Sequence, residues 1–183
     1  TSDQTLSDFL SAVSDTKPIP AGGSVAALVG ALAAALGVMG ARLAKQSDGE
    51  RTLLRLSRRL YDLVQEDAVA YGALMEAYKI PKELSDRAGT VSNALLKATE
   101  VPLEIAERAC EVAGLLHGLR QVGKPTVYSD LTEGMILAIA TADAGLFTAR
   151  TNVKCSTNHH VMELVQAKII KTRESLEELK RLS

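Results

Sequence analysis

Two aspartates occupy positions where a carboxylate could do chemistry. Asp67 interrupts an apolar series of helical spacing between Arg51 and Tyr78, at a position where another apolar residue is due. Burying a carboxylate is costly unless it is hydrogen-bonded, paired or facing a wet cavity, so Asp67 is either functional or at the edge of the core. Asp130 precedes Glu133 by three residues, the spacing of a capping box, so it is either a helix cap or a functional group.

A glycine-rich turn formed by Gly22, Gly23 and Ser24 precedes a long uncharged stretch. A turn that enters a helix can present backbone N–H groups to an anion, and Ser24 is placed to be the N-cap. The turn lacks the GxxxxGK[ST] spacing of a P-loop and the GxGxxG of a dinucleotide fold. As a phosphate-binding motif it is therefore weak.

The histidines and cysteines do not form a metal motif. His117, His159 and His160 have no partners at metal-ligand spacing, and adjacent histidines on a helix point to different faces. Cys110 and Cys155 supply neither a metal framework nor a convincing disulfide set. The sequence thus predicts no metal site.

The element that must position the turn is a helix over residues 24–45. Its small residues recur at alternating spacings of four and three, which indicates close approach by another helix, from this chain or from a second subunit. Its bulky residues form a second stripe, so we expect the helix to be buried all round at the centre of the molecule. Three glycines interrupt the uncharged run, which argues against a membrane span. The bulky residues are Val25, Val29, Leu32, Leu36, Met39 and Leu43.

Helical periodicity continues along the chain, and no segment reads as a strand. Pro18 and Pro81 end helices, and Pro102 starts or kinks one, because proline disfavours helical angles before it and removes a donor. Besides the central helix, we expect helices over residues 6–13, 51–78, 85–99, 102–122, 130–152 and 161–176, with a loop over 122–130. The prediction is an all-α bundle of about six helices, in one domain spanning residues 1–183.

Composition narrows the class of protein. The chain has 183 residues, 46% hydrophobic and only 3% aromatic, so small residues and leucine must fill the core. A formal charge of −1 gives no electrostatic reason to expect nucleic acid or an anionic membrane as a partner. No cleavable signal pattern precedes the first expected helix, so a cytoplasmic location is the default expectation.

Four motifs occur in a fixed order: "PIPAGGSVAA", "EDAVAYGALMEAYKIPK", "ATEVPLEIAE", and "SDL" followed about twenty residues later by an asparagine. Together they resemble the formiminotetrahydrofolate cyclodeaminase and methenyltetrahydrofolate cyclohydrolase family. The resemblance runs over nearly the whole chain. It implies an all-helical homodimer that acts on a one-carbon unit carried by tetrahydrofolate.

Matching the family's motifs residue by residue implies Asp130 and Asp67 as catalytic groups around one cleft. The same matching implies that the substrate-binding residues are Gly22, Gly23, Ser24, Tyr71, Lys79, Lys82, Ser129 and Asn152. Ala21 stands where the family usually has a third glycine, and Thr148 where it has the first of two asparagines.

The implied chemistry suits these residue types. In the cyclodeaminase reaction one carboxyl group, in its protonated form, protonates the departing nitrogen, while the other, as a carboxylate, removes a proton from the attacking one. In the alternative, the cyclohydrolase reaction, a carboxylate stabilises the cationic methenyl bridge and takes a proton from water. Neither reaction requires a cofactor beyond the folate substrate, whose anionic tail lysines or a helix N-terminus would receive. The alternative from another class is a non-catalytic helical dimerisation module.

Overall fold

The computed structural model describes residues 5–156 and 159–183, and in residues 159–161 only the helical backbone. Six α-helices and one short 3-10 helix occur in this part of the chain, and no strand occurs there. The all-α prediction is therefore confirmed. The elements are α1 (Leu6–Val13), α2 (Gly22–Leu43), α3 (Ser47–Lys79), α4 (Arg87–Val122), η1 (Pro125–Val127), α5 (Tyr128–Lys154) and α6 (His159–Leu182).

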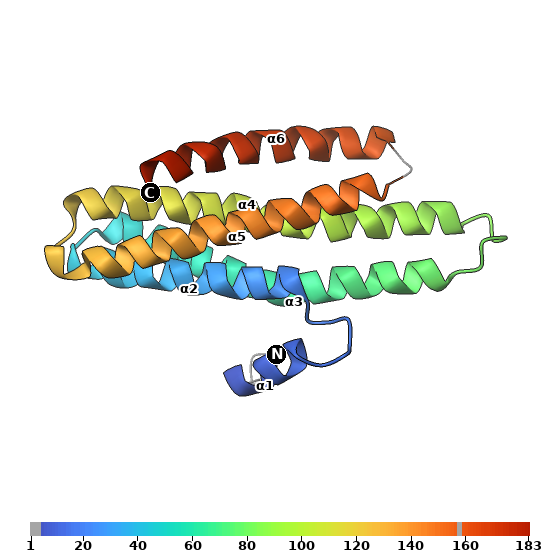
Figure 1. The fold of residues 1–183 in the computed structure, drawn as a ribbon, viewed down its shortest axis with the longest axis horizontal. Helices are drawn as coiled ribbons and strands as arrows, with labels where there is room; N and C mark the ends of the chain where they lie inside the picture. Colours follow the sequence, from blue (N-terminus) through green and yellow to red (C-terminus); the bar gives the residue numbers. More distant parts are fainter. Residues whose placement is uncertain (1–4, 157–158) are drawn as a thin grey trace.

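Four long helices form the body of the molecule. Helices α2, α3, α4 and α5 lie side by side around the main core, and α6 packs against α4 and α5 (Figure 1). Helix α1 lies outside this body and contributes no buried residue (Figure 1).

Glycines on α2 let its neighbours approach closely. A Cβ at Gly37 would lie 2.8 Å from Leu116 Cδ2 of α4, and one at Gly40 would lie 2.5 Å from Leu131 Cδ2 of α5. Such contacts are shorter than real Cβ atoms allow, so a side chain at either position would push a core leucine away. The small-residue stripe thus serves packing within this chain, not a second subunit.

Within a single chain, α2 is not buried all round as predicted. Its small residues face the core, but Leu32 is 55% exposed and Leu43 is 44% exposed. The reason is geometric, since α3, α4 and α5 occupy the small-residue side of α2. The bulky row therefore lies on the outside of this chain.

Two predicted helices are one. Helix α4 runs unbroken from Arg87 to Val122 with Pro102 in its interior. Pro102 lacks the N–H that would bond to the carbonyl of Ala98 four residues earlier. Asn152 of α5 replaces that donor, because its Nδ2 donates to Ala98 O at 2.7 Å. The missing helical hydrogen bond is thus supplied from the neighbouring helix, and the helix continues.

The final helix follows its predicted apolar stripe only in part. Val165, Ile169 and Leu176 are buried against α4 and α5, but Leu164 is 78% exposed. The side chains of Val161, His159 and His160 lie outside the described residues.

Candidate active site

Asp67 of α3 lies directly beneath the first turn of α2. The Ser24 hydroxyl donates to Asp67 Oδ2 at 2.9 Å, and the aspartate is only 9% exposed. A Cβ at Gly23 would lie 2.1 Å from Asp67 Oδ1, so only glycine fits at this position. Ala21, not Ser24, occupies the N-cap position, and the predicted capping role of Ser24 is wrong because its hydroxyl bonds across to α3.

The environment of Asp67 favours its protonated form more than water does. Burial raises the pKa of this carboxyl above its ordinary value, and hydrogen bonding by Ser24 partly opposes the shift. A carboxyl with a raised pKa keeps its proton to higher pH than an ordinary aspartate and can therefore serve as a proton donor as well as an acceptor. Asp67 is therefore suited to acid–base chemistry or to holding a polar ligand edge.

Asp130 lies in a different setting. Helix α5 begins at Tyr128 with Val127 at the N-cap position and no side-chain cap, so the predicted capping box of Asp130 and Glu133 is wrong. The cause is the short helix η1, which is followed directly by α5, so that α5 begins at Tyr128, two residues before the predicted start at Asp130. Asp130 is half-buried, and no hydrogen bond or ion pair of its side chain occurs among the contacts described.

The two aspartates lie at opposite ends of α2. Asp67 packs against Gly23, whereas Leu131, next to Asp130, packs against Gly40. Seventeen residues of helix separate Gly23 from Gly40, which corresponds to about 25 Å at 1.5 Å per residue. Within one chain the predicted single cleft around both carboxylates is therefore wrong.

The other predicted site residues divide between these regions. Tyr71 is half-buried one helical turn beyond Asp67, and Gly22 is exposed at the start of α2. Ser129 is exposed beside Asp130. Asn152 lies toward the Asp67 end, because α5 runs antiparallel to α2 and places Thr141 against Gly30, but its amide nitrogen is engaged by Ala98 O.

The two predicted lysines are distant from both carboxylates. Lys79 ends α3, twelve residues or about 18 Å of helix beyond Asp67, and its Nζ pairs with Glu76 Oε1 at 2.6 Å. Lys82 is exposed in the turn between α3 and α4. The structure does not bring either lysine into one group with Asp67.

A cavity beside the glycine-rich turn was missed by the sequence reasoning. It has a volume of about 540 Å³ and lies between α1, the Ile19–Pro20 segment, α2 and the outer face of α3. Two of the chain's few aromatic residues, Phe9 and Tyr61, line it. Its walls come from four separate segments, so no local motif marks it.

Neither cysteine forms a disulfide. Burial is the main cause that raises the pKa of the Cys110 thiol to about 12, so this thiol stays protonated. In residues 5–156 and 159–183, no group of three or more His, Cys, Asp and Glu side chains is placed to hold a metal ion.

The fold and site define the class: an all-helical bundle with a buried, hydrogen-bonded carboxylate beneath a glycine-rich helix start. Residues 5–171 match the family described as formiminotransferase-cyclodeaminase. The chain belongs to this family, which confirms the resemblance seen in its motifs.

Two curated relatives have similar sequences. A methenyltetrahydrofolate cyclohydrolase of Methylorubrum extorquens is 32% identical over 165 residues, which cover 82% of this chain and 77% of the relative. The formimidoyltransferase-cyclodeaminase of Mus musculus is 33% identical over 90% of this chain, but the matched part is only 35% of the mouse protein.

A solved structure has the same fold. The formiminotetrahydrofolate cyclodeaminase of Thermotoga maritima superposes with a TM-score of 0.90 and covers 99% of this chain and 94% of its own, at 23% sequence identity. The likeness extends over the whole bundle.

Proposed function

We propose that this chain is a folate one-carbon enzyme of the cyclodeaminase type, which releases ammonia from formiminotetrahydrofolate and forms methenyltetrahydrofolate. The observation that carries the proposal is the buried Asp67 carboxyl, held by Ser24 in a chain of this family. A scaffold protein has no need of a carboxylate at that position, which disfavours a non-catalytic dimerisation module.

The proposed reaction divides its proton transfers between the two carboxylates. One folate nitrogen attacks the formimino carbon and loses its proton to a base, while an acid protonates the nitrogen that leaves as ammonia. Asp130 has the larger role, since its side chain is unengaged in the contacts described. Asp67 holds the pterin edge or shares the proton, as its raised pKa permits.

The proposal includes a homodimer, because in one chain the two carboxylates lie near opposite ends of α2, where Gly23 and Gly40 are about 25 Å apart along the helix. The exposed bulky row of α2 is the proposed interface, and a two-fold axis across it sets two α2 helices antiparallel. That pairing brings the partner's Asp130 to the end of α2 where Asp67 lies. Each site is then built from both chains.

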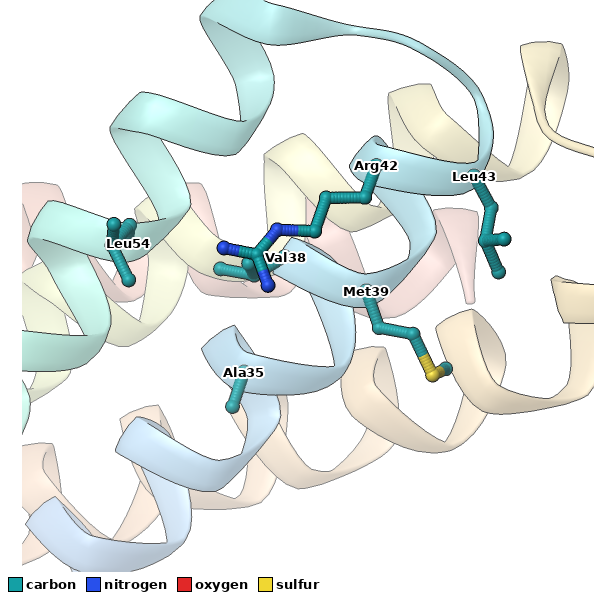
Figure 2. Close-up of a pocket in the computed structure, with 6 residues that line it drawn as sticks. All are labelled: Ala35, Val38, Met39, Arg42, Leu43 and Leu54. Carbon is teal, nitrogen blue, oxygen red and sulfur yellow. The ribbon is translucent and has the colours of Figure 1, made fainter.

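The exposed row supports this arrangement. Met39 and Leu43 are exposed, and together with Leu54 of α3 they line a mainly apolar hollow (Figure 2). On the adjacent helix α5, Ile136 and Leu137 are also exposed. An apolar face of this extent on a soluble chain is typical of a subunit interface.

Helix α2 and the segment Pro125–Lys154, which contains α5, are long and apolar enough to cross a membrane. The apolar window of α2 is 61% buried inside the bundle, which is expected of a core helix. We therefore propose a second copy of the chain, not lipid or nucleic acid, as the partner. We also propose that residues 1–183 form one domain and that this domain is cytoplasmic. It uses no cofactor beyond its folate substrate.

The cyclohydrolase reaction is the second candidate, favoured by the Methylorubrum extorquens relative and its coverage of both chains. The absorbance of methenyltetrahydrofolate separates the two when the purified protein is given each substrate alone. A cyclodeaminase produces the absorbance from formiminotetrahydrofolate, whereas a cyclohydrolase removes it from methenyltetrahydrofolate.

An aspartate variant tests the catalytic assignment. Asp130→Asn removes the charge and keeps the size, so turnover is expected to fall about a hundred- to ten-thousand-fold, with the melting temperature nearly unchanged. Turnover within about threefold of the parent would refute the assignment of Asp130 as an acid–base group.

A further inference from the structure

The outer face of α3 carries a row of three arginines, of which only Arg51 has an ion pair, with Asp48, in the part of the chain that the structure describes. Arg51, Arg55 and Arg58 are exposed and spaced by four and three residues, which places them on one side of the helix. No ion pair of Arg55 or Arg58 occurs among the described residues. Like charges at these spacings repel one another, so the row does not stabilise the helix.

Arg59, the next residue along the chain, differs from Arg55 and Arg58 because it is ion-paired. Arg59 is held by Glu66 and by Glu104, with Nη2 lying 2.7 Å from Glu104 Oε2. Arg55, Arg58 and Arg59 all line a shallow hollow of about 390 Å³, but within the described residues only Arg59 of the three has a structural partner on α4. The positive charges of Arg55 and Arg58 are therefore available to an anion from outside.

The hollow adjoins the cavity beside the glycine-rich turn, because the two share a wall residue. Asp62 continues the row at the next helical spacing and lines both the hollow and the cavity. The cavity wall beyond Asp62 is mainly apolar and includes Tyr61 and Phe9. The outer face of α3 thus borders an apolar cavity with two aromatic side chains at one end and carries arginines at the other.

We infer that this groove binds the p-aminobenzoyl-glutamate half of the folate substrate, with the ring in the cavity and the glutamate carboxylates on Arg55 and Arg58. This inference rests on the proposed function and names the part of the site that receives the tail. Aromatic side chains pack on the ring, and guanidinium groups bind carboxylates in paired hydrogen bonds. Asp62, between the two ends, accepts the amide N–H.

The lengths agree with this assignment. Along α3, Arg58 is about 4.5 Å and Arg55 about 9 Å from Tyr61, the range that an amide-linked glutamate must bridge. At its other end the cavity is bounded by Pro20 and Ala68, which adjoin the glycine-rich turn and Asp67. A ring in the cavity therefore places the attached pterin beside the glycine-rich turn that covers Asp67. The tail runs away from Lys79 and Lys82, the residues implied by the family motifs.

Binding of the fragment p-aminobenzoylglutamate, measured by titration calorimetry on the full chain, tests the inference. The double variant Arg55→Gln/Arg58→Gln is expected to raise the Kd at least about tenfold, because two charge-assisted contacts are lost. Its affinity is also expected to depend less on salt than that of the parent. p-Aminobenzamide, which lacks the glutamate, is expected to bind parent and variant alike.

The matched control is Lys79→Gln/Lys82→Gln, which removes the same number of charges from the same helix and its turn. Loss of fragment binding in the lysine variant but not in the arginine variant would overturn the inference, as would a parent that does not bind the fragment at millimolar concentration. Unchanged circular dichroism shows that each variant is folded.

Turnover is measured separately, so the two proposals fail separately. A chain that binds the fragment through its arginines but converts neither folate substrate refutes the proposed function and keeps the tail site. A chain that turns over formiminotetrahydrofolate with the same KM after loss of both arginines refutes the tail site alone.

Discussion

At the scale of single residues, Asp67 shows how packing changes the properties of a carboxyl. Gly23 leaves room for the side chain, and Ser24 donates a hydrogen bond to it, yet the carboxylate has lost most of its water. Burial is the larger effect, so the pKa of Asp67 lies above its ordinary value. The charged form is therefore less favourable in the folded chain than in the unfolded chain.

That shift has a consequence for stability. A carboxyl whose pKa is raised by folding stabilises the fold at low pH and loses this contribution as the pH rises through its folded pKa. Asp67→Asn keeps the shape and an oxygen for Ser24 but never ionises. We expect the variant to gain stability relative to the parent between pH 4 and pH 8, where each kcal/mol corresponds to about 2–4 °C in melting temperature.

Thermal unfolding of both proteins across this pH range measures the difference. Asp62→Asn, on the exposed face of the same helix, is the matched control and is expected to follow the parent at every pH. A difference between Asp67→Asn and the parent that stays constant from pH 4 to pH 8 would contradict a burial-raised pKa.

At the scale of elements, Pro102 and Asn152 explain why sequence patterns located the helices but misjudged one boundary. A proline inside a helical pattern predicts a break, because its own helix cannot replace the missing donor. The replacement comes from Asn152, fifty-four residues beyond Ala98, and no local pattern can reveal it. Asn152 was predicted from family motifs as a substrate ligand, and the structure gives its amide nitrogen a packing role.

We expect Asn152→Ala to destabilise the fold by about 1–3 kcal/mol, since a buried carbonyl of Ala98 then lacks a donor. Adding Pro102→Ala restores a backbone N–H to α4, so the double variant recovers part of that loss. Denaturant unfolding of the parent, both single variants and the double variant gives the coupling energy. Thr151→Ala, one residue away and exposed, is expected to change stability by less than about 0.5 kcal/mol.

Additive effects of Asn152→Ala and Pro102→Ala, within about 0.5 kcal/mol, would mean that the side chain does not replace the helical donor.

At the scale of the whole molecule, the sequence predicts the bundle well and the site only in pieces. Helical periodicity and the glycines of α2 are local properties, and they indicated the elements and the close packing of α2. The distance between Asp67 and Asp130 depends on which end of α2 each one meets, and that is decided by tertiary contacts. Likewise, the side of α2 left uncovered follows from the placement of α3, α4 and α5.

The separation of the aspartates makes the shared site testable with mixed dimers. Asp67→Asn and Asp130→Asn are each expected to be inactive as homodimers. When the two are unfolded together and refolded in equal amounts, half of the dimers contain one of each, and one of their two composite sites is intact. We expect the mixture to recover about a quarter of the parent activity, measured by the formation of methenyltetrahydrofolate.

A mixture of Asp67→Asn with the double variant Asp67→Asn/Asp130→Asn is the control, because no pairing of these chains has an intact site. It is expected to stay inactive. If each chain instead carried a complete site, every chain in the first mixture would lack one carboxylate, and its activity would not exceed that of either homodimer. Recovery in the first mixture alone therefore requires that Asp67 of one chain and Asp130 of the other serve the same substrate.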